Sequence, residues 1–246
     1  MSLRGVAALV GCLALGCGGS AASRELKVSA AMSLKEVFTE VAAGFEAEHP
    51  GVDVVFNFAG TQILAGQIED GAPVDVFASA DEPQMQRAIA SGRVDAAERF
   101  ASNRLVLISP ATAPIVGPAD LARAGLRLVL AGPGVPAGSY ARQALQELGV
   151  AEAALANLVS NEENVRGVVG KVSAGEADAG VVYTTDITPA VADKLHVVAM
   201  AVSVTPRYEV AVLKDSPQAA LGQAFVAGLK MSAGQAILAK HGFLQP

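Results

Sequence analysis

The chain has 246 residues, of which 52% are hydrophobic and 17% are charged. This composition is too apolar and too weakly charged for an intrinsically disordered protein, and the length suits one large domain or two small ones. The 18 Lys and Arg residues against 24 Asp and Glu residues give a formal net charge of -6. An acidic chain lacks the excess of cations that neutralises phosphates, so we do not expect nucleic acid as a partner.

An apolar run close to the N-terminus predicts an export signal. Arg4 precedes an uncharged stretch over residues 5–16, which is shorter than the roughly 20 residues that a membrane-spanning helix needs. A short basic region followed by a run of this length is typical of a removable secretory signal. We therefore expect residues 1–23 to be a leader, and the mature protein to work outside the cytoplasm, in the periplasm or cell envelope.

The end of the apolar run carries a candidate lipidation site. Leu13-Ala14-Leu15-Gly16-Cys17 resembles the bacterial lipobox, whose Cys is acylated and becomes the first residue of the mature protein. Leu9-Val10-Gly11-Cys12 matches the same short pattern but leaves a very short apolar run, and a plain secretory signal cut near Ala22 is the other alternative. We favour Cys17 as a lipid anchor, which would be the protein's one contact with the membrane.

The first strand and helix are predicted between residues 26 and 51. Residues 26–30 form a β-rich run, and apolar residues then recur at helical spacing over residues 34–45. Ser33 followed by Glu36 is a capping-box pattern, which predicts Ser33 as the N-cap of this helix. His49-Pro50-Gly51 predicts its end, because Pro cannot extend a helix and Gly permits the chain to reverse.

The same alternation of strands and helices continues along the chain. Asp81 followed by Pro83, and Asn164 ahead of a Val-rich helical pattern, predict two further helix starts. Further strands are predicted over residues 52–58, 74–78, 105–108, 126–130, 155–159, 179–183, 195–200 and 208–213. Strands that alternate with helices predict an α/β fold with parallel sheets that helices cover on both faces.

The turns between strands and helices are the candidate ligand sites, because ligands of open α/β sheets bind beyond the carboxyl ends of the strands. These turns contain hydroxyls, amides, glycines and small apolar residues, with few charges. They lie at residues 30–33, 59–62, 132–138, 161–165 and 183–186. Helix N-termini carry unpaired N–H donors and partial positive charge, so such turns can form an anion site without Lys or Arg.

Each candidate residue also has a purely structural interpretation. Ser33 fits a helix cap, although a capping hydroxyl still has a proton to donate to a ligand. Thr61 fits an ordinary turn residue, Tyr183 a core position, and Arg166 a solvated helix residue or ion-pair partner. The spacing of the His residues is not that of metal ligands, and we expect the surface or helix ends for His49, His196 and His241.

Sequence patterns of common catalytic and cofactor sites are missing. No G-x-S-x-G nucleophile elbow and no P-loop pattern occurs, and Pro133, Val135 and Pro136 break a dinucleotide fingerprint around Gly132. Residues 18–246 contain no Cys, and hence no disulfide or Cys metal site. We therefore expect no cofactor and no catalytic residues.

Six segments of the chain, taken together, resemble the periplasmic molybdate-binding proteins of ABC importers. The resemblance runs in order through nearly all of residues 26–243, and the six segments are much more specific together than any one alone. They are residues 30–34 (AAMSL), 58–61 (FAGT), 71–81 (GAPVDVFASAD), 135–141 (VPAGSYA), 164–167 (NVRG) and 180–183 (GVVY).

The resemblance implies the type II fold of periplasmic binding proteins. This fold has two α/β lobes, each a mainly parallel sheet flanked by helices, with two hinge crossovers and an oxyanion clamped between the lobes. By this analogy one lobe takes residues 24–103 and 205–246, and the other takes residues 104–204.

The oxyanion contacts of the family fall on five positions of this chain. Ser33 and Thr61 in the first lobe would donate from hydroxyl and backbone N–H, Ala137 and Val165 in the second from backbone N–H, and Tyr183 from its phenol O–H. Thr61 departs from the family, which commonly has Ser here. Its extra methyl group leaves the pocket size and the molybdate or tungstate preference open, while oxyanion binding is retained.

The resemblance also implies a function and partners. It describes a monomeric extracytoplasmic solute-binding protein that captures molybdate or tungstate and delivers it to the membrane permease of an ABC transporter. No free metal cation and no cofactor is expected, because molybdenum would be bound as its oxyanion. Three alternatives are a binding protein for another small oxyanion such as sulfate, an enzyme on the same fold, and the sensor half of a transcription regulator. The secretory start argues against the regulator.

Overall fold

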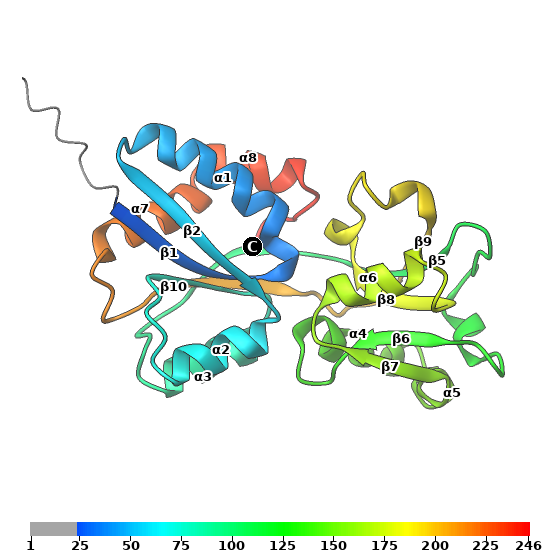
Figure 1. Ribbon diagram of the computed structural model, residues 1–246. Helices are drawn as coiled ribbons and strands as arrows, with labels where there is room; N and C mark the ends of the chain where they lie inside the picture. The colour runs from blue at the N-terminus through cyan, green and yellow to red at the C-terminus, as the bar shows by residue number, and fades with distance from the viewer. Residues whose placement is uncertain (1–23) are drawn as a thin grey trace, which may run out of the picture.

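Short β-rich runs form strands, and amphipathic runs form helices, in the part of the chain that the structure covers. The computed structural model describes residues 24–246, so the predicted leader, residues 1–23 with Cys17, lies outside the described residues. The strands make two five-stranded sheets that lie side by side, each with its own helices (Figure 1). We call the part built on the first sheet lobe 1 and the part built on the second sheet lobe 2.

Lobe 1 has its sheet in the order β2-β1-β3-β10-β4. The strands are β1 (Arg24–Ala31), β2 (Val52–Ala59), β3 (Val76–Ser79), β4 (Glu98–Ser102) and β10 (Arg207–Val212). One face of the sheet carries α1 (Lys35–Glu48), α7 (Ala219–Lys230) and α8 (Ser232–Lys240), and the other carries α2 (Thr61–Glu69) and α3 (Glu82–Ala90) (Figure 1). Helices therefore lie on both faces of the sheet, as the sequence predicts.

Lobe 2 has its sheet in the order β7-β6-β8-β5-β9. The strands are β5 (Leu105–Pro110), β6 (Leu128–Ala131), β7 (Leu158–Glu162), β8 (Ala179–Tyr183) and β9 (Leu195–Ala199). Helices α4 (Pro136–Glu147) and α6 (Val165–Ser173) pack on β6 and β8, and α5 (Ala151–Ala156) packs on α4. Within residues 24–246, no helix combines the length and the apolarity that crossing a bilayer requires.

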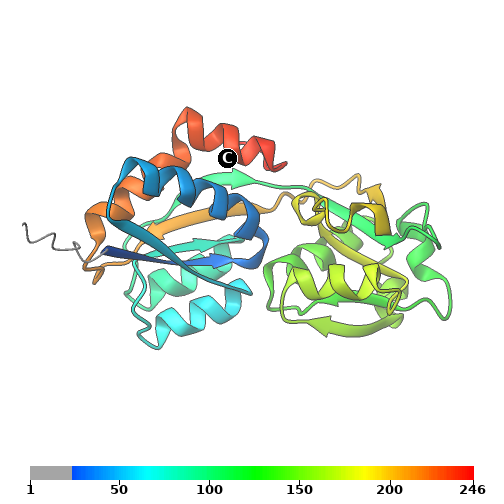
Figure 2. The same cartoon turned by 45° about the horizontal axis from the view of Figure 1, so that its top comes forward.

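Each sheet has four strands in one direction and one strand that runs against them. The reversed strand is β10 in lobe 1, antiparallel to β3 and β4, and β5 in lobe 2, antiparallel to β8 and β9. Both are the first strand after the chain crosses between the lobes, from β4 to β5 and from β9 back to β10 (Figure 2). A strand reached by such a crossing needs no helical connection, whereas parallel neighbours do. The predicted fold of two mainly parallel α/β lobes with two crossovers is confirmed.

Most of the predicted helix boundaries are confirmed. Asp81 caps α3 by accepting a hydrogen bond from the Gln84 N–H at 3.0 Å, and Asn164 caps α6. Helix α1 ends at Glu48, and Gly51 has a φ of 81°, a left-handed conformation that favours glycine.

Two local predictions are wrong, and one strand was missed. Ser33 is not an N-cap, because it lies in the 3₁₀ turn η1 (Met32–Leu34) and its hydroxyl pairs with Tyr208 instead. The strand predicted from residue 155 begins at Leu158, because the Ala-rich residues before it form α5. Strand β4 was not predicted, since its Glu-Arg-Phe-Ala-Ser sequence lacks alternation, and only its second half is buried.

Candidate functional site

The two lobes meet at a small cavity beyond the carboxyl ends of their strands. The space open to the centre of a water molecule is about 20 Å³, enough for a water-sized group but not for an extended organic molecule. Lobe 1 contributes Ala31, Met32, Ser33, Ala59, Gly60, Thr61 and Ala80, and lobe 2 contributes Val135, Pro136, Ala137, Asn164, Val165 and Tyr183. The cavity is therefore suited to a compact ligand held from both sides.

All five predicted contact residues line this one cavity. The structure thus brings together residues from the turns after β1, β2, β6, β7 and β8, as the strand–helix pattern predicts. That these residues bind an anion stays a prediction. Ala80 was missed, because the turn after β3 was not among those singled out. Its place directly beyond a predicted strand was the available signal.

Three helix N-termini supply backbone donors to the cavity. Thr61 is the first residue of α2, and Val165 is the first residue of α6. Pro136 opens α4 and has no N–H, so the first donor of that helix is Ala137. N–H groups in a first helical turn have no partner within the helix. Three such groups therefore surround the cavity at the positive ends of helix dipoles.

The cap of α6 leaves its first N–H available. The Asn164 side-chain oxygen accepts from the N–H of Arg166 at 3.0 Å and from the N–H of Gly167 at 3.3 Å. It accepts nothing from the backbone N–H of Val165, a residue that lines the cavity. The cap thus satisfies the second and third donors of the helix and does not pair with the first.

The Tyr183 hydroxyl is a buried donor without a protein acceptor. The side chain is 1% exposed, and its oxygen is among the buried polar atoms of residues 24–246 that have no hydrogen-bond partner. Burial raises the pKa of Tyr183 well above its usual value, so the hydroxyl keeps its proton. Because an unsatisfied buried donor costs about 1–3 kcal/mol, an acceptor atom in the cavity would be stabilised here.

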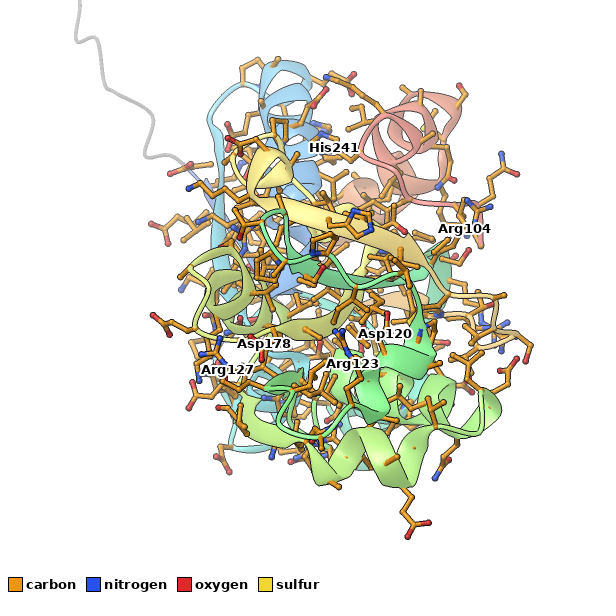
Figure 3. The ribbon with its side chains drawn as sticks, turned by 90° about the vertical axis from the view of Figure 1, so that its right-hand side faces the viewer. Arg104, Asp120, Arg123, Arg127, Asp178 and His241 are labelled. Carbon is orange, nitrogen blue, oxygen red and sulfur yellow. The ribbon has the colours of Figure 1, made fainter. Side chains whose placement is uncertain are left out.

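No charged side chain lines the cavity. Arg166 pairs instead with Glu36 of α1, which confirms it as an ion-pair partner. Another ion pair, Arg127 with Asp178 at 2.7 Å, lies at the amino ends of β6 and β8, on the side of lobe 2 opposite the cavity (Figure 3). Positive charge in the cavity therefore comes from helix ends and not from cationic side chains.

Two of the three His residues lie at helix ends, as predicted. His49 and His241 are the C-caps of α1 and α8, and His241 Nε2 lies 2.8 Å from Glu40 Oε2. Within residues 24–246, no three His, Cys, Asp or Glu side chains are grouped so that they could hold a metal ion.

Two buried carboxyls lie next to the cavity-lining residues. Burial raises the pKa of Asp186 to about 7 and that of Asp81 to about 6. Asp186 accepts a hydrogen bond from the backbone N–H of Tyr183 at 2.9 Å, and Asp81 follows the lining residue Ala80. Raised pKa values reduce the negative charge of these groups near neutral pH and so weaken their repulsion of an anion.

The lobes touch each other around the cavity. The Gln62 side-chain amide of lobe 1 donates to the Glu163 carbonyl of lobe 2 at 2.9 Å, and that of Gln84 donates to the Gly134 carbonyl at 3.2 Å. A Cβ on Gly60 would lie 2.4 Å from the Glu163 carbonyl oxygen. Only glycine therefore permits this approach of the two backbones.

The family model described as bacterial extracellular solute-binding protein matches residues 26–244. The chain belongs to this family. Its members are solute-binding proteins, which agrees with two lobes on either side of a small cavity.

Individual relatives match over most of their length. The chain is 41% identical over 234 residues to the molybdate-binding protein ModA of Mycobacterium tuberculosis, covering 93% of this chain and 88% of that one. The periplasmic molybdate-binding protein of Azotobacter vinelandii has a TM-score of 0.78 at 24% identity, covering 90% and 99% of the two chains. The sulfate-binding protein SubI of M. tuberculosis has a TM-score of 0.79 at 17% identity, covering 89% and 86%. Likeness of fold alone thus does not distinguish the two anions.

The raised pKa of Asp186 predicts a pH-dependent stability. An acid with a folded pKa of about 7, against an ordinary value of 3.8, stabilises the fold fully below pH 3.8. That contribution is lost as the pH rises toward 7. We expect Asp186→Asn to lessen the fall in the free energy of unfolding between pH 4 and pH 8 by up to about 4 kcal/mol.

Urea unfolding at several pH values measures this effect. Asp81, whose pKa is raised to about 6, contributes a second and smaller fall in the free energy of unfolding as the pH rises. The Asp186→Asn variant keeps this smaller fall. Asp215→Asn is the control, because that carboxylate is 73% exposed, and it should follow the wild type. Curves for Asp186→Asn and wild type that stay parallel from pH 4 to pH 8 would contradict the prediction.

Proposed function

We propose that this protein binds molybdate outside the cytoplasm and delivers it to the membrane permease of an ABC transporter. The observation that carries the proposal is a small cavity between the lobes, lined by uncharged residues, in which the buried Tyr183 hydroxyl has no protein acceptor. The likeness to ModA of M. tuberculosis supports molybdate as the ligand. Ser33, Thr61, Ala137, Val165 and Tyr183 are the proposed contacts.

The donor set explains why a fully deprotonated anion is preferred. The four oxygens of molybdate are all acceptors, so a cavity that offers only N–H and O–H donors can satisfy them, at about 1.5–3 kcal/mol for each charge-assisted hydrogen bond. Hydrogen phosphate carries a proton of its own. One of its O–H groups would meet a donor, which leaves polar groups unpaired at a cost of about 1–3 kcal/mol.

Sulfate is the second candidate, and tungstate a further ligand. Sulfate matches molybdate in charge and shape, and the fold is as similar to SubI as to the A. vinelandii molybdate-binding protein. The donors therefore do not separate these anions, and discrimination rests on the size of the closed cavity. Thr61 lines the cavity, is 1% exposed and has one methyl group more than Ser, so this residue bears on the choice of anion.

Closure of the lobes is the proposed transport signal. We take residues 24–103 and 205–246 as one lobe and residues 104–204 as the other. An anion that contacts both lobes stabilises the closed state, because these contacts exist together only when the lobes meet. The closed surface is then the one that the permease recognises. In this proposal the protein acts as a monomer, binds without catalysis, and is exported by the leader over residues 1–23, with Cys17 as its lipid anchor.

Calorimetry with molybdate, tungstate and sulfate tests the ligand. We expect tight 1:1 binding of molybdate and tungstate and much weaker binding of sulfate by the mature protein at constant ionic strength. Equal heats for molybdate and sulfate would shift the assignment to a general oxyanion carrier. No heat with any of the three would overturn it.

The contact residues are tested by removing single hydroxyls. Tyr183→Phe should weaken molybdate binding about 10-fold to 100-fold, the equivalent of one charge-assisted hydrogen bond. The same change should leave the ligand-free protein equally stable or more stable, because it removes an unsatisfied buried group. Ser33→Ala should also weaken binding. Unchanged affinity in both variants would show that the ligand lies elsewhere.

Closure is tested at Gly60, where an added methyl group would meet the other lobe. Gly60→Ala should lower molybdate affinity at least about 10-fold, because the Glu163 carbonyl must move away before the lobes close. Gly66→Ala is the matched control, since a Cβ at Gly66 has nothing within 4 Å. X-ray scattering with and without molybdate should show closure of the control but incomplete closure of Gly60→Ala. Identical affinities of the two variants would contradict the role of this approach.

A further inference from the structure

A chain of buried hydrogen bonds lies behind Ser33, outside the proposed contact set. Ser33 Oγ lies 3.0 Å from the Tyr208 hydroxyl, which lies 3.4 Å from Asn103 Nδ2. Asn103 Nδ2 also donates to Thr185 Oγ1 at 2.9 Å. Tyr208 is 0% exposed and Asn103 is 1% exposed, so bulk water does not compete for these groups.

The direction of the proton donation follows from the Asn103 amide. Its oxygen accepts a hydrogen bond from the Arg104 backbone N–H at 2.8 Å, which turns the NH₂ group toward the two hydroxyls. An NH₂ group only donates, so the Tyr208 oxygen is the acceptor in that contact. Ser33 Oγ is the other polar atom that the Tyr208 hydroxyl contacts. Because Tyr208 is 0% exposed and an unpaired buried donor is unfavourable, we infer that Tyr208 donates its single proton to Ser33 Oγ.

The state of Tyr208 determines what Ser33 presents to the cavity. A Ser hydroxyl has one proton and two lone pairs. When Ser33 Oγ accepts from Tyr208, its own proton does not go to Tyr208 and stays available to the cavity that Ser33 lines. Burial raises the pKa of Tyr208, so its proton remains in place for this contact.

We propose that Asn103 and Tyr208 are positioning residues that hold Ser33 as a hydrogen-bond donor toward the bound oxyanion. This inference rests on the proposed function and adds a specificity device to it. A Ser33 fixed as a donor favours an anion with acceptor oxygens only. A Ser33 free to turn its proton toward Tyr208 would offer a lone pair and accept a protonated anion equally well.

The same residues belong to the hinge between the lobes. Asn103 lies in the crossing from β4 to β5, and its N–H donates to the Pro206 carbonyl in the returning crossing at 3.0 Å. Its partner Thr185 lies in the 3₁₀ turn η3 (Thr184–Asp186) of lobe 2, directly after the β8 strand that ends at Tyr183. The chain that orients Ser33 is therefore anchored to both crossings and to both lobes.

We call the hydrogen-bonded residues Asn103 and Tyr208 the relay. A double-mutant cycle tests whether the relay acts through Ser33. Tyr208→Phe removes only the hydroxyl. It keeps the ring and its edge-to-face contact with Phe243, in which the ring centroids are 5.3 Å apart. We expect it to weaken molybdate binding about 3-fold to 10-fold, and to have no further effect in the Ser33→Ala background. Tyr183→Phe, at a direct contact, should weaken binding in both backgrounds.

Anion selectivity gives a readout that loss of packing would not change. In Asn103→Asp the carboxylate accepts the Tyr208 proton, Tyr208 accepts from Ser33, and Ser33 faces the ligand with a lone pair. The added charge repels molybdate and hydrogen phosphate alike at pH 8, where both are dianions. The ratio of the two affinities, measured by competition, therefore isolates the relay, and we expect it to fall at least 10-fold.

The failure of this inference can be distinguished from the failure of the proposed function. Wild-type affinity in Tyr208→Phe, full additivity with Ser33→Ala, or an unchanged anion ratio in Asn103→Asp would overturn the relay while the wild type still binds molybdate. Absence of binding by the wild-type protein to molybdate, tungstate and sulfate would overturn the proposed function, and the relay with it.

Discussion

Buried hydrogen-bond donors without protein acceptors are the constraint on which the architecture of the site depends. First-turn N–H groups of α2, α4 and α6 and the Tyr183 hydroxyl meet in one cavity, where no protein acceptor satisfies Tyr183. Leaving such groups buried and unpaired is unfavourable. In the proposed function, an anion with acceptor oxygens would remove the penalty from both lobes at once, so the same contacts would stabilise ligand binding and lobe closure.

The electrostatics of the site is local. The chain carries a formal net charge of -6, yet the cavity is lined by neutral residues at the positive ends of helices. At short range these dipoles act more strongly than distant surface charges that water and salt screen. The raised pKa values of Asp81 and Asp186 fit this picture, because nearby carboxyls that are partly protonated repel an anion less.

The hinge and the site are built from the same segments. Strands β5 and β10 are reversed because each follows a crossing between the lobes. These crossings hold Asn103 and lead into Tyr208, whose hydroxyl contacts Ser33 at the cavity. A movement of the lobes about the crossings would therefore act directly on Asn103 and Tyr208, the residues that we propose orient Ser33, and no long path through the core would be needed.

Local patterns in the sequence determined the turns that form the site, and only tertiary contacts decided how their side chains are used. The strand–helix pattern predicted the turns that hold Ala137 and Val165, at the first turns of α4 and α6. The resemblance to the molybdate-binding family named the two residues as donors, and that role stays a prediction. The partner of Ser33 was not predictable from local patterns, because Tyr208 is distant in sequence and replaces the expected cap. Strand β4 and the Glu36–Arg166 pair likewise depend on the meeting of remote segments. Periodicity and capping report interactions within a few residues, whereas the crossings between the lobes, the cavity between them and the contact of Ser33 with Tyr208 arise only once the chain has folded.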